Sequence, residues 1–178
     1  MSGRVPIIQT VAALNSMKKR GITLMNAIRE VVDNSWDWMG ESLLLGDARV
    51  HVHISMDEND DLTMIIVDNA AGIPRWVRID PKTGEGIPMD SESEADCEGL
   101  QMALRVGGRI SRPRSGHIGR FGFGLPQSAL ALCNTTHVHS KTKGGEWRHL
   151  ELDIEEMRKP ENLDSAMRPV LAEPDIET

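Results

Sequence analysis

The sequence is poor in aromatic residues, in cysteine and in long apolar runs. It contains no tyrosine and two phenylalanines, and aromatic residues make up 3% of its 178 residues. Its two cysteines, Cys97 and Cys133, follow no metal-binding spacing, and a disulfide framework of the secreted kind is excluded. No run approaches the roughly 20 apolar residues of a membrane span, and the N-terminus lacks a signal-peptide pattern. We therefore expect a cytoplasmic protein without a membrane segment.

The chain also has fewer basic than acidic residues. The 27 Asp and Glu residues exceed the 20 Lys and Arg residues and give a net charge of −7 at pH 7. Because nucleic acids are held by clustered cations, we do not expect this domain alone to bind them. A local group of arginines could still contact phosphate groups or form a solvated loop, and both interpretations stay open. The group comprises Arg109, Arg112, Arg114 and Arg120.

The hydrophobic pattern predicts an α/β protein. Apolar residues at three- and four-residue steps predict helices over 5–19 and from Ile22 or Thr23 to Trp38. Apolar residues also predict a strand over 49–55 and a central strand over 62–67. The remaining expected elements are a long irregular loop over 75–98, a short helix over 99–106, a glycine-rich turn and helix over 119–133, and a hairpin of strands over 135–142 and 146–154. The expected folded domain spans 1–155, and 156–178 is a polar tail or a truncated remainder.

The first motif lies on the second predicted helix. Glu30, Asn34 and Asp37 follow one another at four- and three-residue steps, which places them on one face, and Asp33 lies beside them. Taken alone, such a stripe is typical of a solvent-exposed helix face.

The second motif follows the apolar strand. Asp68 ends this strand, and Gly72 and Ile73 come shortly after it. A carboxylate, followed by a glycine that allows a ligand close to the backbone, suits recognition of a flat ring with an exocyclic amine. An ordinary tight turn is the alternative.

The third motif is a glycine-rich segment that leads into a helix. Glycines at 119, 122 and 124 expose backbone N–H groups, and the positive end of the next helix points at them, which favours phosphate. The segment lacks the Gly-Lys-Ser/Thr ending of a P-loop, and no strand precedes it as in a dinucleotide-binding fingerprint.

In this order the three motifs resemble those of the GHKL ATPases of the Bergerat fold, which include gyrase, MutL proteins, heat-shock-90 chaperones, MORC proteins and sensor histidine kinases. Glu-Val-Val-Asp-Asn-Ser-x-Asp from Glu30 resembles the N-box of gyrase and MORC proteins. Ile-Gly-Arg-Phe-Gly-Phe-Gly-Leu from Ile118 resembles the lid loop of the heat-shock-90 and MORC branches. The resemblance covers residues from about 22 to 142 and implies an α/β sandwich, in which helices cover one face of a mixed, largely antiparallel sheet.

The resemblance also implies roles for individual residues. Glu30 would be the general base, Asn34 would bind Mg²⁺, Asp68 would accept a hydrogen bond from the adenine amine of ATP, and Gly72 would let the backbone approach the base. Residues 75–118 would be a lid. Further nucleotide contacts are implied for Asp37, Ile73, Gly119, Arg120, Phe121, Gly122, Phe123 and Gly124.

Two departures from the family pattern leave turnover open. Ala70 stands where the family usually has glycine, and no Gly-Thr pair, whose threonine supports the aspartate in the family, follows residue 142. Three functions are therefore compatible with the sequence. The first is an ATPase whose lid closure drives conformational change, homodimerisation or partner binding. The others are a nucleotide-dependent protein-binding switch without hydrolysis and a serine/threonine kinase of the anti-sigma type.

Four histidines on two predicted strands offer a different kind of site. His51 and His53 alternate on one strand, and His137 and His139 alternate on another. They could bind a metal ion if the strands were neighbours, but alternating polar residues on a half-exposed sheet are the ordinary explanation.

Overall fold

A computed structural model of the chain describes residues 22–39, 46–105, 107–111, 124–153, 155, 170–171 and 174. The predicted helix over 5–19 lies outside this part of the chain, as do Gly119, Arg120, Phe121, Gly122 and Phe123. Within it, we find no helix with both the length and the apolar character needed to cross a membrane.

Helix α2 (Leu24–Trp38) confirms the helix that was predicted to carry the first motif. Thr23 caps its N-terminus, because the threonine hydroxyl accepts a hydrogen bond of 3.2 Å from the Asn26 amide. Ala27 and Ser35 are buried on this helix. One narrow stripe of α2 therefore faces the protein interior.

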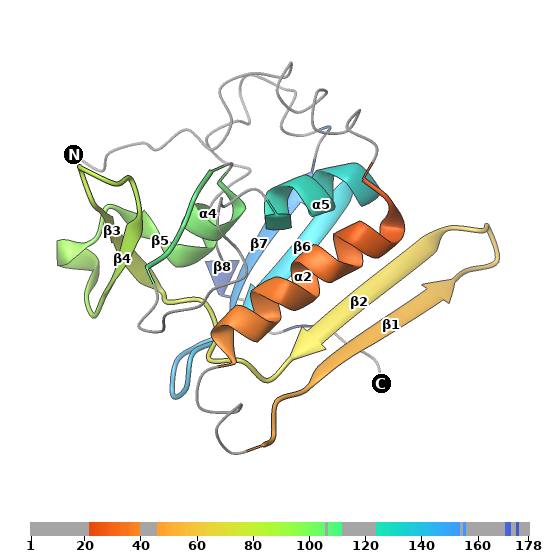
Figure 1. Cartoon of the computed structure of the whole chain (residues 1–178), viewed down its shortest axis with the longest axis horizontal. Coiled ribbons are helices and arrows are strands. Elements are labelled where there is room, and N and C mark those ends of the chain that lie inside the picture. The colour runs from red at the N-terminus through yellow and green to blue at the C-terminus, as the bar shows by residue number, and fades with distance from the viewer. Residues whose placement is uncertain are drawn as a thin grey trace.

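Strands β1 (Val50–Met56) and β2 (Leu62–Asp68) form an antiparallel hairpin and confirm two predicted strands. The prediction that the second strand is central is wrong. Among the described strands β2 pairs with β1 alone, and Leu62 and Val67 are 56% and 42% exposed. The apolar run suggested burial on both faces of the strand. The β1–β2 hairpin instead extends beyond the N-terminal end of α2 and is covered only in part (Figure 1).

The prediction of an irregular loop over 75–98 is also wrong, because this segment forms an antiparallel sheet with the strand order β4-β3-β5. Its strands are two to four residues long, too short to show a two-residue period in the sequence. Helix α4 confirms the short helix predicted next, and Val77 of β3, Met102 of α4 and Ile110 form a small core. The elements are β3 (Trp76–Ile79), β4 (Gly86–Met89), the 3₁₀ helix η1 (Glu92–Glu94), β5 (Cys97–Glu98) and α4 (Gly99–Leu104).

The last part of the chain forms helix α5 (Gly124–Leu132) and a sheet of order β6-β7-β8. The predicted hairpin is confirmed as β6 (Thr135–Ser140) and β7 (Arg148–Asp153). Strand β8 (Val170–Leu171) pairs with β7 and comes from the region that the sequence suggested as a tail.

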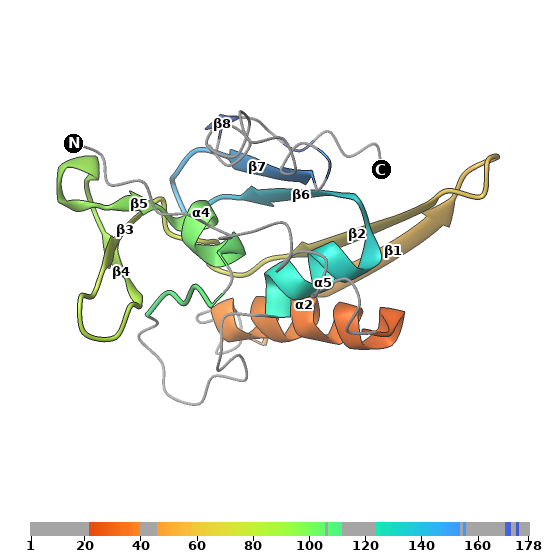
Figure 2. The ribbon, with the colours of Figure 1, turned by 90° about the horizontal axis from the view of Figure 1, so that it is seen from above.

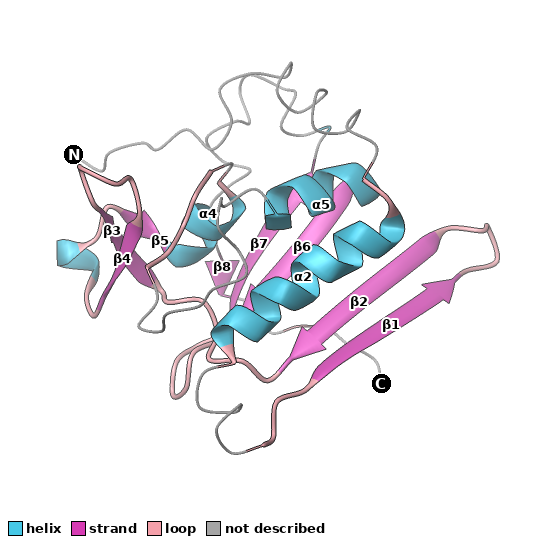
Figure 3. Ribbon diagram, in the orientation of Figure 1, coloured by secondary structure: helices cyan, strands magenta, loops and turns pink. Residues whose placement is uncertain are grey.

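The helices α2 and α5 contact each other and form one layer, with the β6-β7-β8 sheet as the other (Figure 2). Leu150 and Leu152 of β7 lie in the interior at 1% and 2% exposure. The predicted α/β architecture with antiparallel strands is thus confirmed. In the described part of the chain, however, hydrogen bonds join the strands into three separate sheets in place of a single one (Figure 3).

Candidate functional site

The first two sequence motifs meet at Asp68, the last residue of β2. The buried Ser35 hydroxyl of α2 donates a hydrogen bond of 2.6 Å to Asp68 Oδ2. The Ala70 amide donates a bond of 3.0 Å to Asp68 Oδ1. These bonds fix the orientation of the carboxylate, and each of its oxygens can still accept a further hydrogen bond. An amine is therefore a suitable ligand at this position.

The turn after Asp68 is held on two sides. The Ala71 amide donates 2.9 Å to the Trp38 carbonyl at the end of α2, and the Ile73 amide donates 2.7 Å to Ser140 Oγ of β6. Gly72 has a φ of +76°, and a β-carbon there would overlap the Lys141 carbonyl. Only glycine suits this position, because it combines the left-handed conformation with a close approach between two backbone segments.

The polar stripe of α2 carries Glu30 and Asn34 one turn apart. Asn34 Nδ2 donates a hydrogen bond of 2.7 Å to the Glu30 carbonyl of the same helix. Because this bond uses the amide nitrogen, the side-chain oxygen is the Asn34 atom suited to Mg²⁺, which prefers oxygen ligands. The Glu30 side chain is exposed.

Glu30 also lies against the first residue of α5. A β-carbon at Gly124 would overlap Glu30 Oε2, so the carboxylate and the backbone at the N-terminus of α5 are in direct contact. The N-terminus of a helix carries partial positive charge and exposed N–H groups, which attract anions. The contact therefore brings a potential base and a potential phosphate-binding element together at one place.

Four of the predicted site residues that the structure describes thus lie in connected positions. Glu30 and Asn34 share a face of α2, Asp68 is bonded to the same helix, and Gly124 touches Glu30. Asp37 is also on α2 and half-buried. The other predicted glycine-rich-loop residues lie outside the described part of the chain.

The contact between Ser35 and Asp68 was not among the sequence-based predictions. Ser35 is buried on α2, with 6% of its surface exposed. A buried hydroxyl on an otherwise apolar stripe requires a partner, which was the available signal. Among the described residues, Ser35 of α2 supplies the hydroxyl that donates to Asp68.

The histidines do not form the metal site considered from the sequence. In the residues that the structure describes, no group of three or more metal-ligating side chains could hold an ion. His137 and His139 stack instead on His149 of β7, with ring centroids 5.3 and 4.3 Å away. Burial, followed by repulsion from the neighbouring histidines His139 and His137, lowers the pKa of His149 below its usual value.

The sequence of the chain matches one known protein family. A search among curated protein sequences gives no significant match. The family model described as histidine kinase-, DNA gyrase B- and HSP90-like ATPase matches residues 22–174, which include all three motifs and the strands β6, β7 and β8. Because this match covers more than half of the chain, the chain belongs to the family of histidine kinase-, DNA gyrase B- and HSP90-like ATPases.

Proposed function

We propose that this ATP-binding domain binds Mg-ATP against α2 and hydrolyses it. One arrangement supports the proposal most: Ser35 of α2 orients Asp68, while Glu30, five residues earlier on α2, lies against the N-terminus of α5. Helix α2 therefore connects Asp68, the carboxylate proposed to recognise adenine, with Glu30, the carboxylate beside the N-terminus of α5. This relation fits a nucleotide, which carries an amine at one end and phosphates at the other.

At the adenine end, Asp68 would accept a hydrogen bond from the exocyclic amine. Its bonds with Ser35 and Ala70 hold the carboxylate before the ligand arrives, which reduces the loss of entropy on binding. The close backbone contact at Gly72 keeps the turn in a fixed position next to that carboxylate.

At the phosphate end, Glu30 would act as general base. Its carboxylate would take a proton from a water molecule while the water oxygen bonds to the γ-phosphorus and the bond to the bridging oxygen of ADP breaks. The products are ADP and inorganic phosphate. The N-terminal N–H groups of α5 would offset the negative charge of the phosphates.

Asn34 would hold the magnesium ion through its side-chain oxygen. This oxygen remains available because the hydrogen bond to the Glu30 carbonyl uses the side-chain nitrogen. When bound, Mg²⁺ neutralises phosphate charge and takes most of its ligands from phosphates and water. Only one protein oxygen is needed for this role.

Thermal unfolding with and without a nonhydrolysable Mg-ATP analogue tests binding. A ligand at a hundred times its Kd adds about 2.7 kcal/mol, or roughly 5–10 °C for a chain of this size. Asp68→Asn should lose this shift, whereas Asp90→Asn, a change at an exposed aspartate, should keep it. A wild-type chain that shows no shift at millimolar analogue would refute the proposed binding.

Phosphate release under saturating Mg-ATP tests hydrolysis. Glu30→Gln should bind the analogue like the wild type and lose turnover, and Glu58→Gln in the β1–β2 turn serves as the control. If the wild type turns over no faster than Glu30→Gln, the chain is a nucleotide-dependent switch and not an ATPase.

We also propose that nucleotide binding promotes association with a second copy or another protein. Light scattering with and without the analogue measures this association.

The lid proposed over 75–118 would not be a single irregular loop, because its part up to 105 folds into strands and α4.

A further inference from the structure

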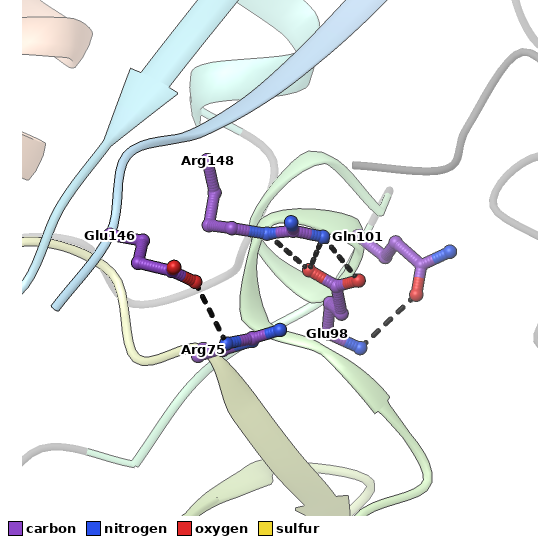
Figure 4. Close-up of polar contacts among 5 residues, drawn as sticks. All are labelled: Arg75, Glu98, Gln101, Glu146 and Arg148. Carbon is purple, nitrogen blue, oxygen red and sulfur yellow. Dashed lines mark hydrogen bonds and ion pairs between the residues drawn. The ribbon is translucent and has the colours of Figure 1, made fainter. Parts of the chain in front are cut away.

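A nearly buried ion pair links two separate sheets of the protein (Figure 4). Arg148, the first residue of β7, donates hydrogen bonds of 3.0 and 2.8 Å to Glu98 Oε2 and one of 2.7 Å to Oε1. The side chains of Arg148 and Glu98 are 12% and 17% exposed. This planar, multiply bonded geometry is the strongest form of an arginine–carboxylate pair.

Glu98 occupies a junction in the β3–β5–α4 unit. It ends β5 opposite Trp76 of β3, it is the N-cap residue of α4, and its amide donates 3.1 Å to Gln101 Oε1. The next amide, that of Gly99, donates 2.8 Å to the Arg75 carbonyl. Glu98 is thus attached directly to the segment that follows the Asp68–Pro74 turn.

Arg148 occupies a matching position on the other sheet. Its cross-strand partner is Ser140 of β6, and Ser140 Oγ accepts the 2.7 Å hydrogen bond from the Ile73 amide. Two neighbouring side chains of one hairpin therefore hold the turn at Ile73 and the start of α4 at Glu98. The turn between them contacts the same hairpin at Lys141 through Gly72.

We propose that Glu98 and Arg148 are positioning residues for the Asp68–Pro74 turn, and that their ion pair sets the affinity of the site for ATP. This inference rests on the proposed function. The pair fixes the distance between the β3–β5–α4 unit and the β6–β7 hairpin, and the turn lies between these two parts. Loss of the pair lets the turn move away from the orientation in which Asp68 faces the ligand.

The chain offers a matched control pair. Arg75 and Glu146 join the same two parts of the structure with an N–O distance of 3.4 Å, but their side chains are 45% and 63% exposed. Exposed ion pairs are screened by water and contribute little. Glu146→Gln therefore changes the same charge without disturbing the nearly buried pair.

The test compares the full-length wild type with Glu98→Gln, Arg148→Lys and Glu146→Gln. Calorimetry at low temperature gives the Kd for a nonhydrolysable Mg-ATP analogue, and hydrogen exchange of peptides gives local opening of the backbone. We expect a Kd that is roughly five- to thirtyfold higher in the first two variants, which equals about 1–2 kcal/mol. Exchange over residues 69–76 should rise in both, while α2 stays protected and Glu146→Gln behaves like the wild type.

Wild-type Kd and wild-type exchange over 69–76 in both variants would overturn the positioning role. Equal acceleration of exchange in the turn and in α2 would also overturn it, because that pattern indicates general destabilisation. If the wild type itself fails to bind the analogue, the proposed function fails. The exchange measurement then still shows whether the pair holds the turn. Arg148→Lys keeps the charge and provides a folded variant if Glu98→Gln is unstable.

Discussion

Ser35 of α2 donates a hydrogen bond of 2.6 Å to Asp68 at the end of β2, 33 positions further along the chain. The bond joins the Glu-Asn helix to the aspartate turn. Since Ser35 directly follows Asn34, the residues proposed for magnesium and for adenine, Asn34 and Asp68, are linked through two adjacent positions of α2. Their relative position depends on the packing of α2 against β2.

Replacement of Ser35 by alanine should weaken both folding and binding. The change removes one hydrogen bond to a charged acceptor, and we expect a loss of about 1–3 kcal/mol in the free energy of unfolding. The analogue should bind more weakly because Asp68 is no longer oriented. Urea unfolding and calorimetry measure the two effects. Ser55→Ala on the exposed strand β1 is the control, and equal behaviour of the two variants would contradict the assignment.

Replacement of Gly72 by alanine should destabilise the fold strongly. The new β-carbon would overlap the Lys141 carbonyl, and alanine is strained at a φ of +76°. We expect a loss of about 2–4 kcal/mol in urea unfolding. Gly84→Ala isolates the conformational part, because Gly84 has a φ of +72° and open space around it. Similar losses in both variants would show that the backbone approach at Lys141 does not matter.

The sequence predicts the elements with long patterns and misses those without. The 3.6-residue period gives α2 correctly, and the alternation from Val50 gives β1. The strands between Trp76 and Glu98 escape detection, because a strand of two to four residues cannot be distinguished from a loop by its period. The apolar run of β2 predicts a strand correctly but gives the wrong degree of burial, which depends on the neighbours that tertiary packing supplies.

The residues of the site likewise fall into those that the sequence predicts and those that it does not. Glu30, Asn34 and Asp68 could be proposed from spacing and from resemblance, because their roles are attached to motif positions. Ser140, which contacts the turn at Ile73, and Arg148, which contacts Glu98, could not be proposed in this way, because no sequence spacing shows that Ser140 lies opposite Arg148. Contacts across a hairpin depend on register, and they become visible only when the strands are paired.

Replacement of Gly124 by alanine should reduce turnover more than it affects stability. A methyl group at the start of α5 would displace the Glu30 carboxylate that lies against it. Alanine is a good helix former, so the helix itself should persist. Phosphate release should fall roughly ten- to hundredfold through misplacement of the base, with the analogue Kd nearly unchanged. Wild-type turnover in this variant would show that the contact between Glu30 and Gly124 plays no part in the reaction.

The two cysteines should differ in reactivity. Burial, aided by the charge of Asp96, raises the pKa of the Cys97 thiol to about 11, whereas Cys133 is exposed. At pH 8 only about one in a thousand Cys97 thiols is then ionised, and the thiolate is the reactive form. Iodoacetamide followed by mass spectrometry should modify Cys133 first. Faster modification of Cys97 in the folded chain would contradict its burial beside Val77.

The histidine stack should make stability fall as the solution becomes acidic. Burial, and then repulsion from His139 and His137, lowers the pKa of His149 below its usual 6.5, and Glu151 opposes this shift only in part. The unfolded chain therefore binds a proton at this histidine before the folded chain does. The contribution is fully present above about pH 6.5 and is lost as pH falls through that value towards the folded pKa.

Urea unfolding at several pH values between about 7.5 and 5.5 measures this effect for the wild type, His149→Gln and His51→Gln. Because glutamine does not titrate, His149→Gln should show a flatter dependence of the unfolding free energy on pH than the wild type. His51 lies on exposed β1, away from the stack, and its variant should follow the wild-type curve. A steeper loss of stability towards acid in His149→Gln would mean that the folded state stabilises the protonated form of this histidine, opposite to the direction that its surroundings impose.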